Sequence, residues 1–532
     1  MWPPNSPPES SHTSRVDKSS SGSNDDPQLK EQCSWPLTQE QQDVIDEVAA
    51  GNNVFYTGSA GSGKSTLISA IVKKVWEMGK SVQVIAPSRV VAALHPGGMT
   101  VERFLGHIPN SMDIPINQLL HALSGKSTMK VAERRRFAAD VLIIDEINMV
   151  SGEMLERINH LMTQLRPRKI RRADIHAPCG GAQLVVTGNF GQLPPTDPFR
   201  CCFLCGKKMR QLQGGSCFTC PSQNYHGGVY QESQKWAFKS NSWDFAKFDH
   251  VHLNEIHRQT DFDFVVILQK FRLRIPFTAD EVRSMMEGGP KLSDATREDL
   301  DKFFEKHRHT EDGFLKIFSG DQLRPVVRLR EGMNVILQVN VDKLAGLCNG
   351  SQGRIVGFEP FNTDRKMLHL SQGGDRPPPF WLVPGLNERF AKDIIRWYME
   401  RNQVQGWPRV EFKLANGELV TRTIRATFQV ESFGGRLLLG RARIPLLPGW
   451  AITVPESQGM TIPRVALRAS DTFGEGQMYT TMSRAPSLNG LTVIGNPHEL
   501  PGCISDDIRK FLTEKFGTTP FMEPQLLNSY GG

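Results

Sequence analysis

The feature that most constrains how this chain folds is a glycine-rich segment, Gly58-Ser-Ala-Gly-Ser-Gly-Lys64-Ser65. It follows a short apolar run, opens a helical pattern, and matches the G-x-x-x-x-G-K-[ST] form of phosphate-binding loops. In such a loop glycines let backbone N–H groups wrap the phosphates, the lysine reaches the β and γ oxygens, and the serine coordinates Mg²⁺. The bare pattern arises by chance in about one chain of this length in fifty, so a chance turn is the weaker interpretation. The predicted nucleotide-binding residues are Gly58, Ser59, Ala60, Gly61, Ser62, Gly63, Lys64, Ser65 and Thr66.

The pattern of apolar runs predicts an α/β fold with more than one lobe. The chain has 532 residues, whereas single hydrophobic cores stop growing near ~250–300 residues. Apolar runs at 53–57, 81–86, 141–144 and 182–187 alternate with helical patterns, which predicts a parallel sheet covered on both faces. A second set begins at 248–253 and resumes at 465–467 and 491–494. Between them, short Gly- and Pro-rich strands at 335–339, 353–357 and 409–413 predict an inserted β-barrel.

The expected domains are a tail at 1–36, a first lobe with the nucleotide site at 37–200, a Cys-rich insertion at 201–232, the first part of a second lobe at 233–345, the barrel at 346–448, and the rest of the second lobe with the C-terminal tail at 449–532. The first segment is rich in Ser and Pro with almost no aliphatics, so we expect it to be disordered. A net charge of +7 permits a polyanionic partner without requiring one.

Membrane association and secretion are not expected. No apolar run approaches the ~18 residues that a membrane span needs. The N-terminus lacks the apolar region of a secretory signal, and acidic residues interrupt any mitochondrial presequence. Nine cysteines are few for this length, which favours a reducing compartment.

Two further segments carry chemistry that suits ATP hydrolysis. The apolar run at 141–144 ends in Asp145 and Glu146, at the sheet edge where ligands of open α/β sheets bind. Asp145 would hold Mg²⁺ and Glu146 would polarise the attacking water. Gln192 follows another apolar strand and is placed to sense the γ-phosphate. A solvated strand end and a Pro-stiffened loop are the alternative interpretations of these two segments.

Two arginines far along the chain are candidate arginine fingers. Arg258 lies in Leu253-Asn-Glu-Ile-His-Arg258, and Arg484 lies in Thr480-Thr-Met-Ser-Arg484. An arginine finger stabilises the charge of the transferring phosphoryl group. A lone Arg is more often a surface charge, and the surrounding motifs single these two out.

With these segments in order, residues 37–500 resemble the superfamily-one DNA helicases of the petite-integration-frequency (PIF-type) family, relatives of the RecD proteins. Residues 37–41 resemble the adenine-reading motif, with Gln41 as the reader. The stretches 86–88 and 97–104 resemble DNA-contact segments, and 178–184 resembles the family's signature stretch. Residues 457–461 resemble the segment that grips DNA and couples it to ATP, and Asn349-Gly350 with Gly353 matches the barrel insert. The DNA-binding residues implied by the resemblance are Ser88, Thr100, Phe104, Ser457, Gln458 and Thr461.

The resemblance implies a 5′→3′ DNA helicase with two RecA-like lobes, ATP and Mg²⁺ between them, and single-stranded DNA across the top. Implied partners are single-stranded DNA, DNA junctions, and replication or repair proteins through the N-terminal tail. Family members act in replication, repair, recombination and telomere maintenance. We therefore expect a monomer in the nucleus, with the mitochondrion as the alternative compartment.

Four positions depart from the family pattern: Asn189 replaces an Asp, and Arg89, Glu102 and Glu456 alter the DNA-contact segments. The two glutamates place negative charge where a phosphate track favours neutral or positive residues. These departures motivate an alternative, a weakly coupled or motor-dead DNA-binding ATPase that serves as a regulatory scaffold. An unrelated phosphate-loop ATPase or kinase is a third interpretation, which Arg258 and Arg484 disfavour.

A cysteine cluster follows the segment that contains Gln192. Cys202 and Cys205 form one Cys-x-x-Cys pair, and Cys217 and Cys220 form a second pair eleven residues later. Four thiolates at this spacing suit tetrahedral Zn²⁺, so the cluster predicts a zinc-knuckle insertion. A loop with free thiols is the alternative, and Cys201 and His226 are substitute ligands.

Overall fold

The computed structural model describes the chain from residue 37 onward, with gaps. Outside the description are 1–36, 89–90, 93, 96, 106–113, 125–134, 167–176, 197, 213–214, 223–228, 260, 274, 288–328, 340, 342–346, 348–350, 361–405, 414–417, 434–436, 450–453, 463, 470–473, 496–503, 518–524 and 527–532. Leu37–Gly532 form one unit, separate from the tail Met1–Pro36. The tail prediction, Arg89, His226, Asn349 and Gly350 therefore lie outside the described residues, as does the side chain of Glu456.

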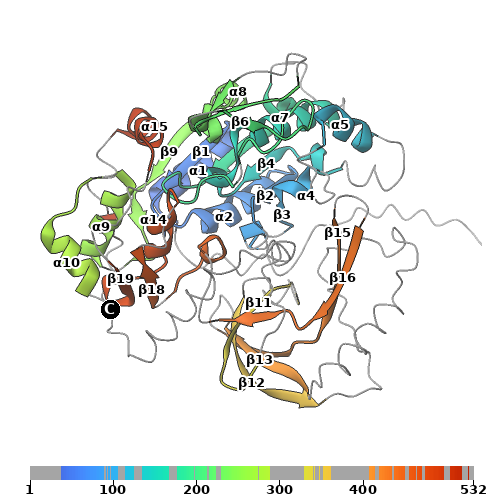
Figure 1. Cartoon of the computed structure of the whole chain (residues 1–532). Coiled ribbons are helices and arrows are strands. Elements are labelled where there is room, and N and C mark those ends of the chain that lie inside the picture. The colour runs from blue at the N-terminus through green and yellow to red at the C-terminus, as the bar shows by residue number, and fades with distance from the viewer. Residues whose placement is uncertain are drawn as a thin grey trace, which may run out of the picture. The chain divides into compact units, whose positions relative to one another are not determined.

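A six-stranded parallel sheet carries the phosphate loop (Figure 1). Its strands are β1 (Val54–Gly58), β2 (Val82–Ala86), β3 (Met99–Thr100), β4 (Val141–Ile144), β5 (Gln183–Thr187) and β9 (Asp249–Leu253). The order is β3-β2-β4-β5-β1-β9, and every neighbouring pair is parallel. The predicted parallel sheet is thereby confirmed.

Alternate residues of these strands enter two separate cores, because successive side chains of a strand point to opposite faces. Val54 and Tyr56 of β1 pack in one core with α1 (Gln39–Ala50) and α2 (Lys64–Glu77). Phe55, between them, packs in the other core with α5 (Ile116–Ser124), α7 (Gly152–Leu165) and α8 (Asn241–Ala246). Helices therefore cover both faces, which accounts for the nearly continuous apolar runs.

One strand expected in the second lobe belongs instead to the first sheet. β9 pairs with β1 along its whole length, from Val54 opposite Asp249 to Gly58 opposite Leu253. The C-terminal helix α15 (Asp506–Phe516) packs against β9 and places Phe511 in a cluster with Phe238 and Phe190. An apolar run specifies burial but not its sheet partner, which is why the sequence pattern placed the 248–253 strand in the wrong lobe.

The remaining α/β part contains a two-stranded parallel sheet, β18 (Val465–Arg468) with β19 (Leu491–Ile494), in the described segments. Around it lie α9 (Phe262–Leu273), α10 (Ala279–Glu287) and α14 (Gln477–Met482). The short strands β10 (Glu255–Ile256) and β20 (Gln525–Leu526), far apart in the chain, pair in parallel. None of the described helices is long and apolar enough to cross a membrane.

The Gly- and Pro-rich region forms an antiparallel sheet with its own core. The order is β14 (Leu419–Thr423), β13 (Gly406–Lys413), β12 (Gln352–Pro360), β11 (Asn334–Leu337) and β17 (Leu446–Pro448). A separate hairpin pairs β15 (Thr427–Phe433) with β16 (Leu437–Arg443). Val335, Ile355 and Phe412 are fully or almost fully buried in this core. The predicted strands are confirmed, and within the described residues the sheet is open, with β14 and β17 at its edges.

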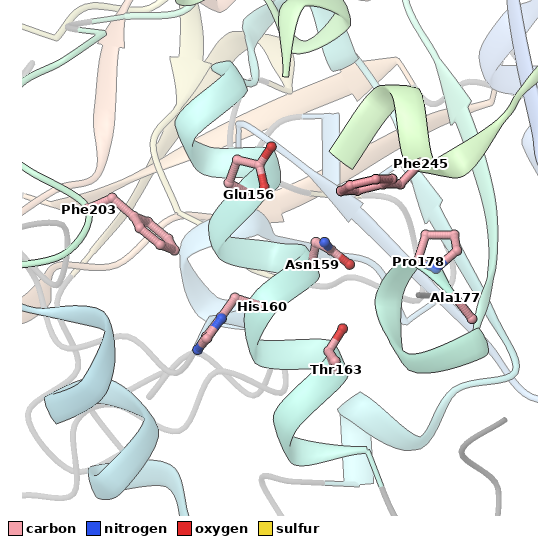
Figure 2. A pocket seen from close by; sticks show the side chains of 8 residues that line it. All are labelled: Glu156, Asn159, His160, Thr163, Ala177, Pro178, Phe203 and Phe245. Carbon is pink, nitrogen blue, oxygen red and sulfur yellow. The ribbon is translucent and has the colours of Figure 1, made fainter. Parts of the chain in front are cut away.

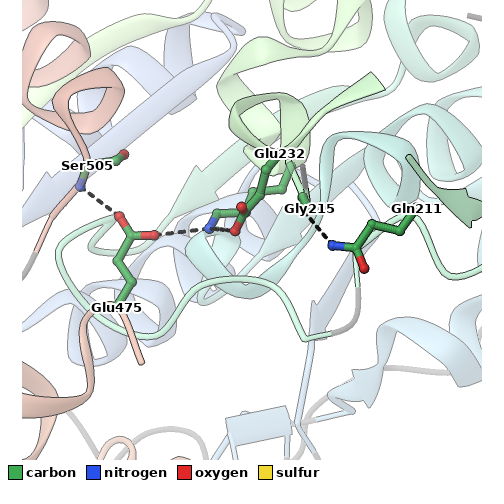
Figure 3. A network of polar contacts seen from close by, with 6 residues as sticks. Gln211, Gly215, Glu232, Glu475 and Ser505 are labelled. Carbon is green, nitrogen blue, oxygen red and sulfur yellow. Dashed lines mark hydrogen bonds and ion pairs between the residues drawn. The ribbon is translucent and has the colours of Figure 1, made fainter. Parts of the chain in front are cut away.

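The Cys-rich segment contains a three-stranded antiparallel sheet, β6 (Arg210–Gln211), β7 (Cys217–Thr219) and β8 (Val229–Gln231). A polar network follows it (Figure 3). Lys235 lies 3.0 Å from a carboxylate oxygen of Glu475, whose other oxygen accepts the Ser505 N–H at 2.7 Å. The residues after the Cys-rich segment are thus tied to the C-terminal part of the chain.

We expect the Phe511→Ala substitution to lower the free energy of unfolding by about 3–5 kcal/mol, because it opens a cavity against Phe238, whose ring stacks on Phe511 at 4.3 Å. Urea denaturation followed by tryptophan fluorescence measures the loss. The matched control is Phe262→Ala, since that ring is 54% exposed and its removal should cost less than about 0.5 kcal/mol. Equal losses in the two variants would contradict the assignment of α15 to the core.

Candidate nucleotide-binding site

The phosphate loop has the shape that its glycines permit. Gly61 and Gly63 have φ of +90° and +77°, in the left-handed region that favours glycine. A Cβ on Gly61 would lie 2.4 Å from the Cβ of Arg258, and one on Gly58 would lie 2.8 Å from the carbonyl oxygen of Leu253. Gly63 caps α2 without a side-chain hydrogen bond, and the first turn contains no acidic residue. The N–H groups of that turn are therefore available to an anion.

Lys64 begins α2 and folds back over the loop. Its ammonium donates to the carbonyl oxygens of Gly58 at 3.0 Å and Ser59 at 2.8 Å. Desolvation lowers the pKa of Lys64 to about 7, and the nearby Glu146 carboxylate partly opposes this change. A bound phosphate would favour the charged ammonium. The side chain is therefore positioned to meet an anion in the loop.

Asp145 and Glu146 lie at the carboxyl end of β4, as the sequence predicts. Both are buried, and Oδ1 of Asp145 accepts the Glu146 N–H at 2.8 Å. Glu146 has φ of +53°, which is uncommon for a residue other than glycine and typical of functional sites. Burial, and then the charge of Asp145, raises the pKa of Glu146 to about 7. A carboxylate whose pKa is raised toward neutral pH suits a general base.

His95 is a site residue that the sequence analysis did not identify. Its Nε2 lies 2.7 Å from Oδ2 of Asp145, and both side chains are almost completely buried. Asp145 and the half-buried Ser65 are the residues whose oxygens fit a magnesium ion beside the loop. A single His in an irregular segment carries no pattern that separates it from a core histidine.

Arg258 lies beside Gly61 of the loop, and Arg484 lies near Arg258 and Glu146. Arg258 donates from Nε to Thr461 Oγ1 at 3.0 Å and from its Nη atoms to Ser483 O and Gly459 O, each at 3.3 Å. The backbone is fixed one residue earlier, where the His257 N–H donates to the Gly61 carbonyl at 2.9 Å.

Arg484 is 2% exposed and donates to Thr480 O at 2.8 Å and Ser457 O at 3.4 Å. Burial, and then the charge of Arg258, lowers the pKa of Arg484 to about 9, while Glu146 opposes this effect. The half-buried Arg258, the buried Arg484 and the buried Glu146 therefore lie close enough to influence one another's charge. Such an arrangement can stabilise developing negative charge on a phosphoryl group.

A buried polar network ties the loop to later parts of the chain. Ser59 Oγ accepts from Gln269 Nε2 at 2.5 Å and from Arg272 Nη1 at 3.1 Å, both on α9. Arg272 Nε also donates to Asn189 Oδ1 at 3.2 Å. Arg272 therefore joins the loop to the segment after β5 that carries Asn189.

Tyr479 on α14 completes this network. Its hydroxyl accepts the Ala60 N–H at 3.0 Å and the Asn189 side-chain N–H at 3.2 Å. None of Gln269, Arg272 and Tyr479 was predicted from the sequence. The available signal was the spacing of Gln269 and Arg272, three apart in the helix Phe262–Leu273, since residues at that spacing lie on one helix face.

Gln41 and Gln192 are both buried. Gln41 Oε1 accepts the Thr38 N–H at 3.2 Å in a capping box, and its Nε2 lies 2.8 Å from where a Cβ of Gly63 would stand. The Gln192 N–H donates to the Asn189 carbonyl at 2.8 Å. Gln41 therefore borders the loop as expected, with its amide oxygen already used by the helix cap.

Five of the six expected DNA-binding residues divide into three groups. Ser88 and Thr100 cap short helices by accepting the N–H of Val91 and Arg103, and both are half-buried. Thr461 is exposed. Ser457 and Gln458 are 3% and 1% exposed, and Gln458 lies close enough to Glu146 to lower its pKa. The Ser457 hydroxyl donates to the Val454 carbonyl at 2.7 Å, and both side chains present almost no surface to a strand.

The assignment of Phe104 to DNA binding is wrong for this structure. Phe104 has no exposed surface and packs edge-on against Phe137 at 5.0 Å. It anchors α4 (Val101–Phe104), whose other face presents Glu102 as half-buried and Arg103 as exposed. An aromatic side chain at this depth cannot stack on a base.

Three of the four predicted zinc ligands converge, and Cys217 does not. Cys202, Cys205 and Cys220 have sulfur atoms within 4.8 Å of one another. Cys217 lies in β7 one residue before Phe218, which packs on the cluster. Because strand residues alternate faces, Phe218 and Cys220 share one side and Cys217 takes the other.

The atoms around the loop fit a nucleotide with Mg²⁺. Buried polar atoms almost always have hydrogen-bond partners. Ser62 Oγ, Glu146 Oε2 and both amide atoms of Gln458 have none among the described residues.

A cavity of about 230 Å³ lies elsewhere, between α7 and α8, and shares no residue with this site (Figure 2).

Comparison with known proteins agrees with this geometry. The sequence profile of the PIF1-like helicases matches residues 36–199. The chain is 30% identical over 483 residues to the zebrafish (Danio rerio) ATP-dependent DNA helicase PIF1, covering 86% of this chain and 61% of that protein. It is 27% identical to the human protein of the same name, covering 86% and 60%. The chain thus spans about three fifths of the length of these relatives. The crystal structure of the Candida albicans Pif1 helicase matches with a TM-score of 0.64 at 24% identity, covering 90% of this chain and 99% of that one. Residues 36–199 therefore match the PIF1-like helicases, and the chain is similar to an ATP-dependent DNA helicase PIF1 over 86% of its length.

Proposed function

We propose that this chain is an ATP-dependent DNA helicase that moves 5′→3′ on single-stranded DNA and unwinds duplex or folded DNA. The observation that carries the proposal is the convergence of Lys64, Glu146, Arg258 and Arg484 on one buried site. Residues before 200 supply the lysine and the carboxylate, and residues after 250 supply both arginines. A site completed by two distant segments changes when those segments move, as a motor requires.

ATP and Mg²⁺ are the proposed ligands of this site. Lys64 would hold the phosphates, Ser65 and Asp145 the metal, and Gln41 the adenine. Glu146 would orient and deprotonate the attacking water, Gln192 would sense the γ-phosphate, and the two arginines would stabilise the transferring group. We also propose Zn²⁺ at the cysteine cluster.

The contacts of Arg258 support a direct coupling between nucleotide and DNA. Its guanidinium bonds Thr461 and the Gly459 carbonyl, within the segment that resembles the family's DNA-gripping motif. Arg484 bonds the Ser457 carbonyl in the same segment. An arginine drawn toward a γ-phosphate would release these acceptors, and the segment could then shift on the strand.

Single-stranded DNA is the proposed track, and DNA junctions are proposed substrates. One solved relative, the Bacteroides Pif1 helicase, is described in complex with ADP-AlF3 and ssDNA. We further propose a role in replication, repair, recombination or telomere maintenance, a two-lobed RecA-like architecture with a closed β-barrel insert, and a monomer in the nucleus or the mitochondrion. The N-terminal tail would recruit replication or repair proteins.

Asn189 favours one second candidate, a weakly coupled DNA-binding ATPase. Its side chain accepts from Arg272 and donates to Tyr479, so it joins the two later segments without a formal charge. An Asp here would place a carboxylate against a buried guanidinium, a stronger contact than the neutral amide makes. Weaker contacts between these segments would couple less of the energy of ATP hydrolysis to movement on DNA.

We expect Lys64→Ala to reduce DNA-stimulated ATP turnover at least ~100-fold, because it removes the charge that meets the phosphates. Binding to a fluorescent single-stranded oligonucleotide should persist, since Lys64 lies in the loop. The matched control is Lys73→Ala on α2, a lysine in the same helix outside the loop. Unchanged turnover in the Lys64 variant would contradict the site.

We expect Thr461→Val to lower the stimulation of ATP turnover by saturating single-stranded DNA about fivefold, since it removes the acceptor of a charged hydrogen bond worth ~1 kcal/mol. The shape of the side chain is kept, and saturating DNA removes any effect on strand affinity. Thr421→Val, at an exposed position of β14, is the control. Equal stimulation ratios in the two variants would argue against coupling through Arg258.

The Asn189→Asp substitution separates the two candidate functions. For an efficient helicase we expect the unwinding rate per ATP hydrolysed to change less than about threefold, which corresponds to under ~0.7 kcal/mol. A rise of tenfold or more in a stopped-flow unwinding assay would instead support the weakly coupled ATPase. Asn148→Asp does not serve as a control, because the Asn148 side chain accepts the Asn189 N–H.

A further inference from the structure

The thiols of Cys202, Cys205 and Cys220 meet outside the nucleotide site. Their sulfur atoms lie within 4.8 Å of one another, and those of Cys205 and Cys220 are 3.4 Å apart. All three are free cysteines. Sulfur atoms around a tetrahedral zinc ion, with Zn–S bonds of about 2.3 Å, are separated by about 3.8 Å. A disulfide would instead bring two sulfurs to ~2.05 Å.

Backbone N–H groups already point at each sulfur. Cys202 accepts from the N–H groups of Leu204 and Cys205, and Cys205 accepts from that of Lys207. Cys220 accepts the Ser222 N–H at 3.5 Å. The turn closes at Gly206, whose N–H donates to the Cys202 carbonyl at 2.8 Å. Hydrogen bonds of this kind stabilise thiolates and orient metal ligands.

The core around these cysteines is too small to fold by itself. Its apolar members are Phe199, Cys202, Met209 and Cys220, with Cys205 and Phe218 at its margin. The Phe199 ring stacks on Phe218 at 5.2 Å and on Tyr230 at 5.6 Å. Cores of this size usually need a metal or a disulfide. The sulfur separations favour the metal.

We propose that Cys202, Cys205 and Cys220 bind one structural Zn²⁺ as thiolates, with Cys217 outside the ligand set. Each thiol releases its proton to solvent on binding. A non-thiolate donor completes the fourth position. This inference does not rest on the proposed helicase function.

The ion would fix Phe203, which lies between the first two ligands, against the first lobe. The Phe203 ring packs beside α7, with the guanidinium of Arg157 at 5.5 Å and the ring of His160 at 6.2 Å (Figure 2). Its carbonyl accepts the Ile116 N–H at 3.4 Å. Phe203 also lines the cavity between α7 and α8, so the zinc module forms one wall of that cavity.

The test is metal analysis by mass spectrometry of the full chain and two matched variants, Cys205→Ser and Cys217→Ser. We expect about one zinc per wild-type chain, the same in the Cys217 variant, and at least a fivefold loss in the Cys205 variant. Trypsin provides a second measurement, since Lys207 and Lys208 are exposed within the module. Chelation should accelerate cleavage there in the wild type and the Cys217 variant, and added Zn²⁺ should reverse it.

Wild-type protein that contains no zinc, contains iron instead, or carries a Cys205–Cys220 disulfide would overturn the proposal. Zinc loss from the Cys217 variant as large as that from the Cys205 variant would overturn the three-thiolate ligand set. If the Cys205→Ser variant fails to fold, the effect of chelation on tryptic cleavage of the wild type decides the question. Zinc content and cleavage are read without ATP or DNA, so failure of the helicase proposal would not affect either result.

Discussion

The contact on which this site depends joins the phosphate loop to side chains more than two hundred residues later. Ser59 and Ala60 of the loop bond Arg272 and Tyr479, and Asn189 bonds both of those residues. Burying a guanidinium and a phenol is costly unless each finds hydrogen-bond partners. The loop, the segment after β5 and the second α/β part therefore hold one another in position, and a change at any of the three reaches the other two.

This arrangement explains why the proposed catalytic groups have shifted pKa values. Burial favours the neutral form of all three groups, so it lowers the pKa of Lys64 and Arg484 and raises that of Glu146. Opposite charges nearby partly reverse these shifts. A phosphate and a divalent cation supply the charges that such a site lacks. The segment at 457–461 contacts both arginines through its carbonyl oxygens and Thr461. Each arginine can therefore link the proposed DNA-gripping motif directly to a bound phosphate.

Sequence patterns predicted the parts of the molecule that depend on local chemistry. The phosphate loop, the carboxylates after β4 and the strands of the antiparallel sheet follow from glycines, apolar runs and turn residues, and the structure has them where expected. Partnership between distant segments was less predictable. β9 joins the first sheet because of a pairing with Val54–Gly58 that no property of its own five residues specifies. Phe104 was assigned to DNA binding by motif position, although burial beside Phe137 decides its role. Cys217 falls outside the thiol cluster through strand alternation, which the Cys-x-x-Cys spacing does not reveal.

The most direct measurement of the central claim is strand separation on two matched substrates, one duplex with a 5′ single-stranded tail and one with a 3′ tail. With ATP and Mg²⁺ present, the account predicts rapid opening of the 5′-tailed duplex and little opening of the 3′-tailed one. Neither should open without ATP. DNA-stimulated hydrolysis with both duplexes intact would contradict the claim that the contacts between the phosphate loop and the later arginines drive a motor.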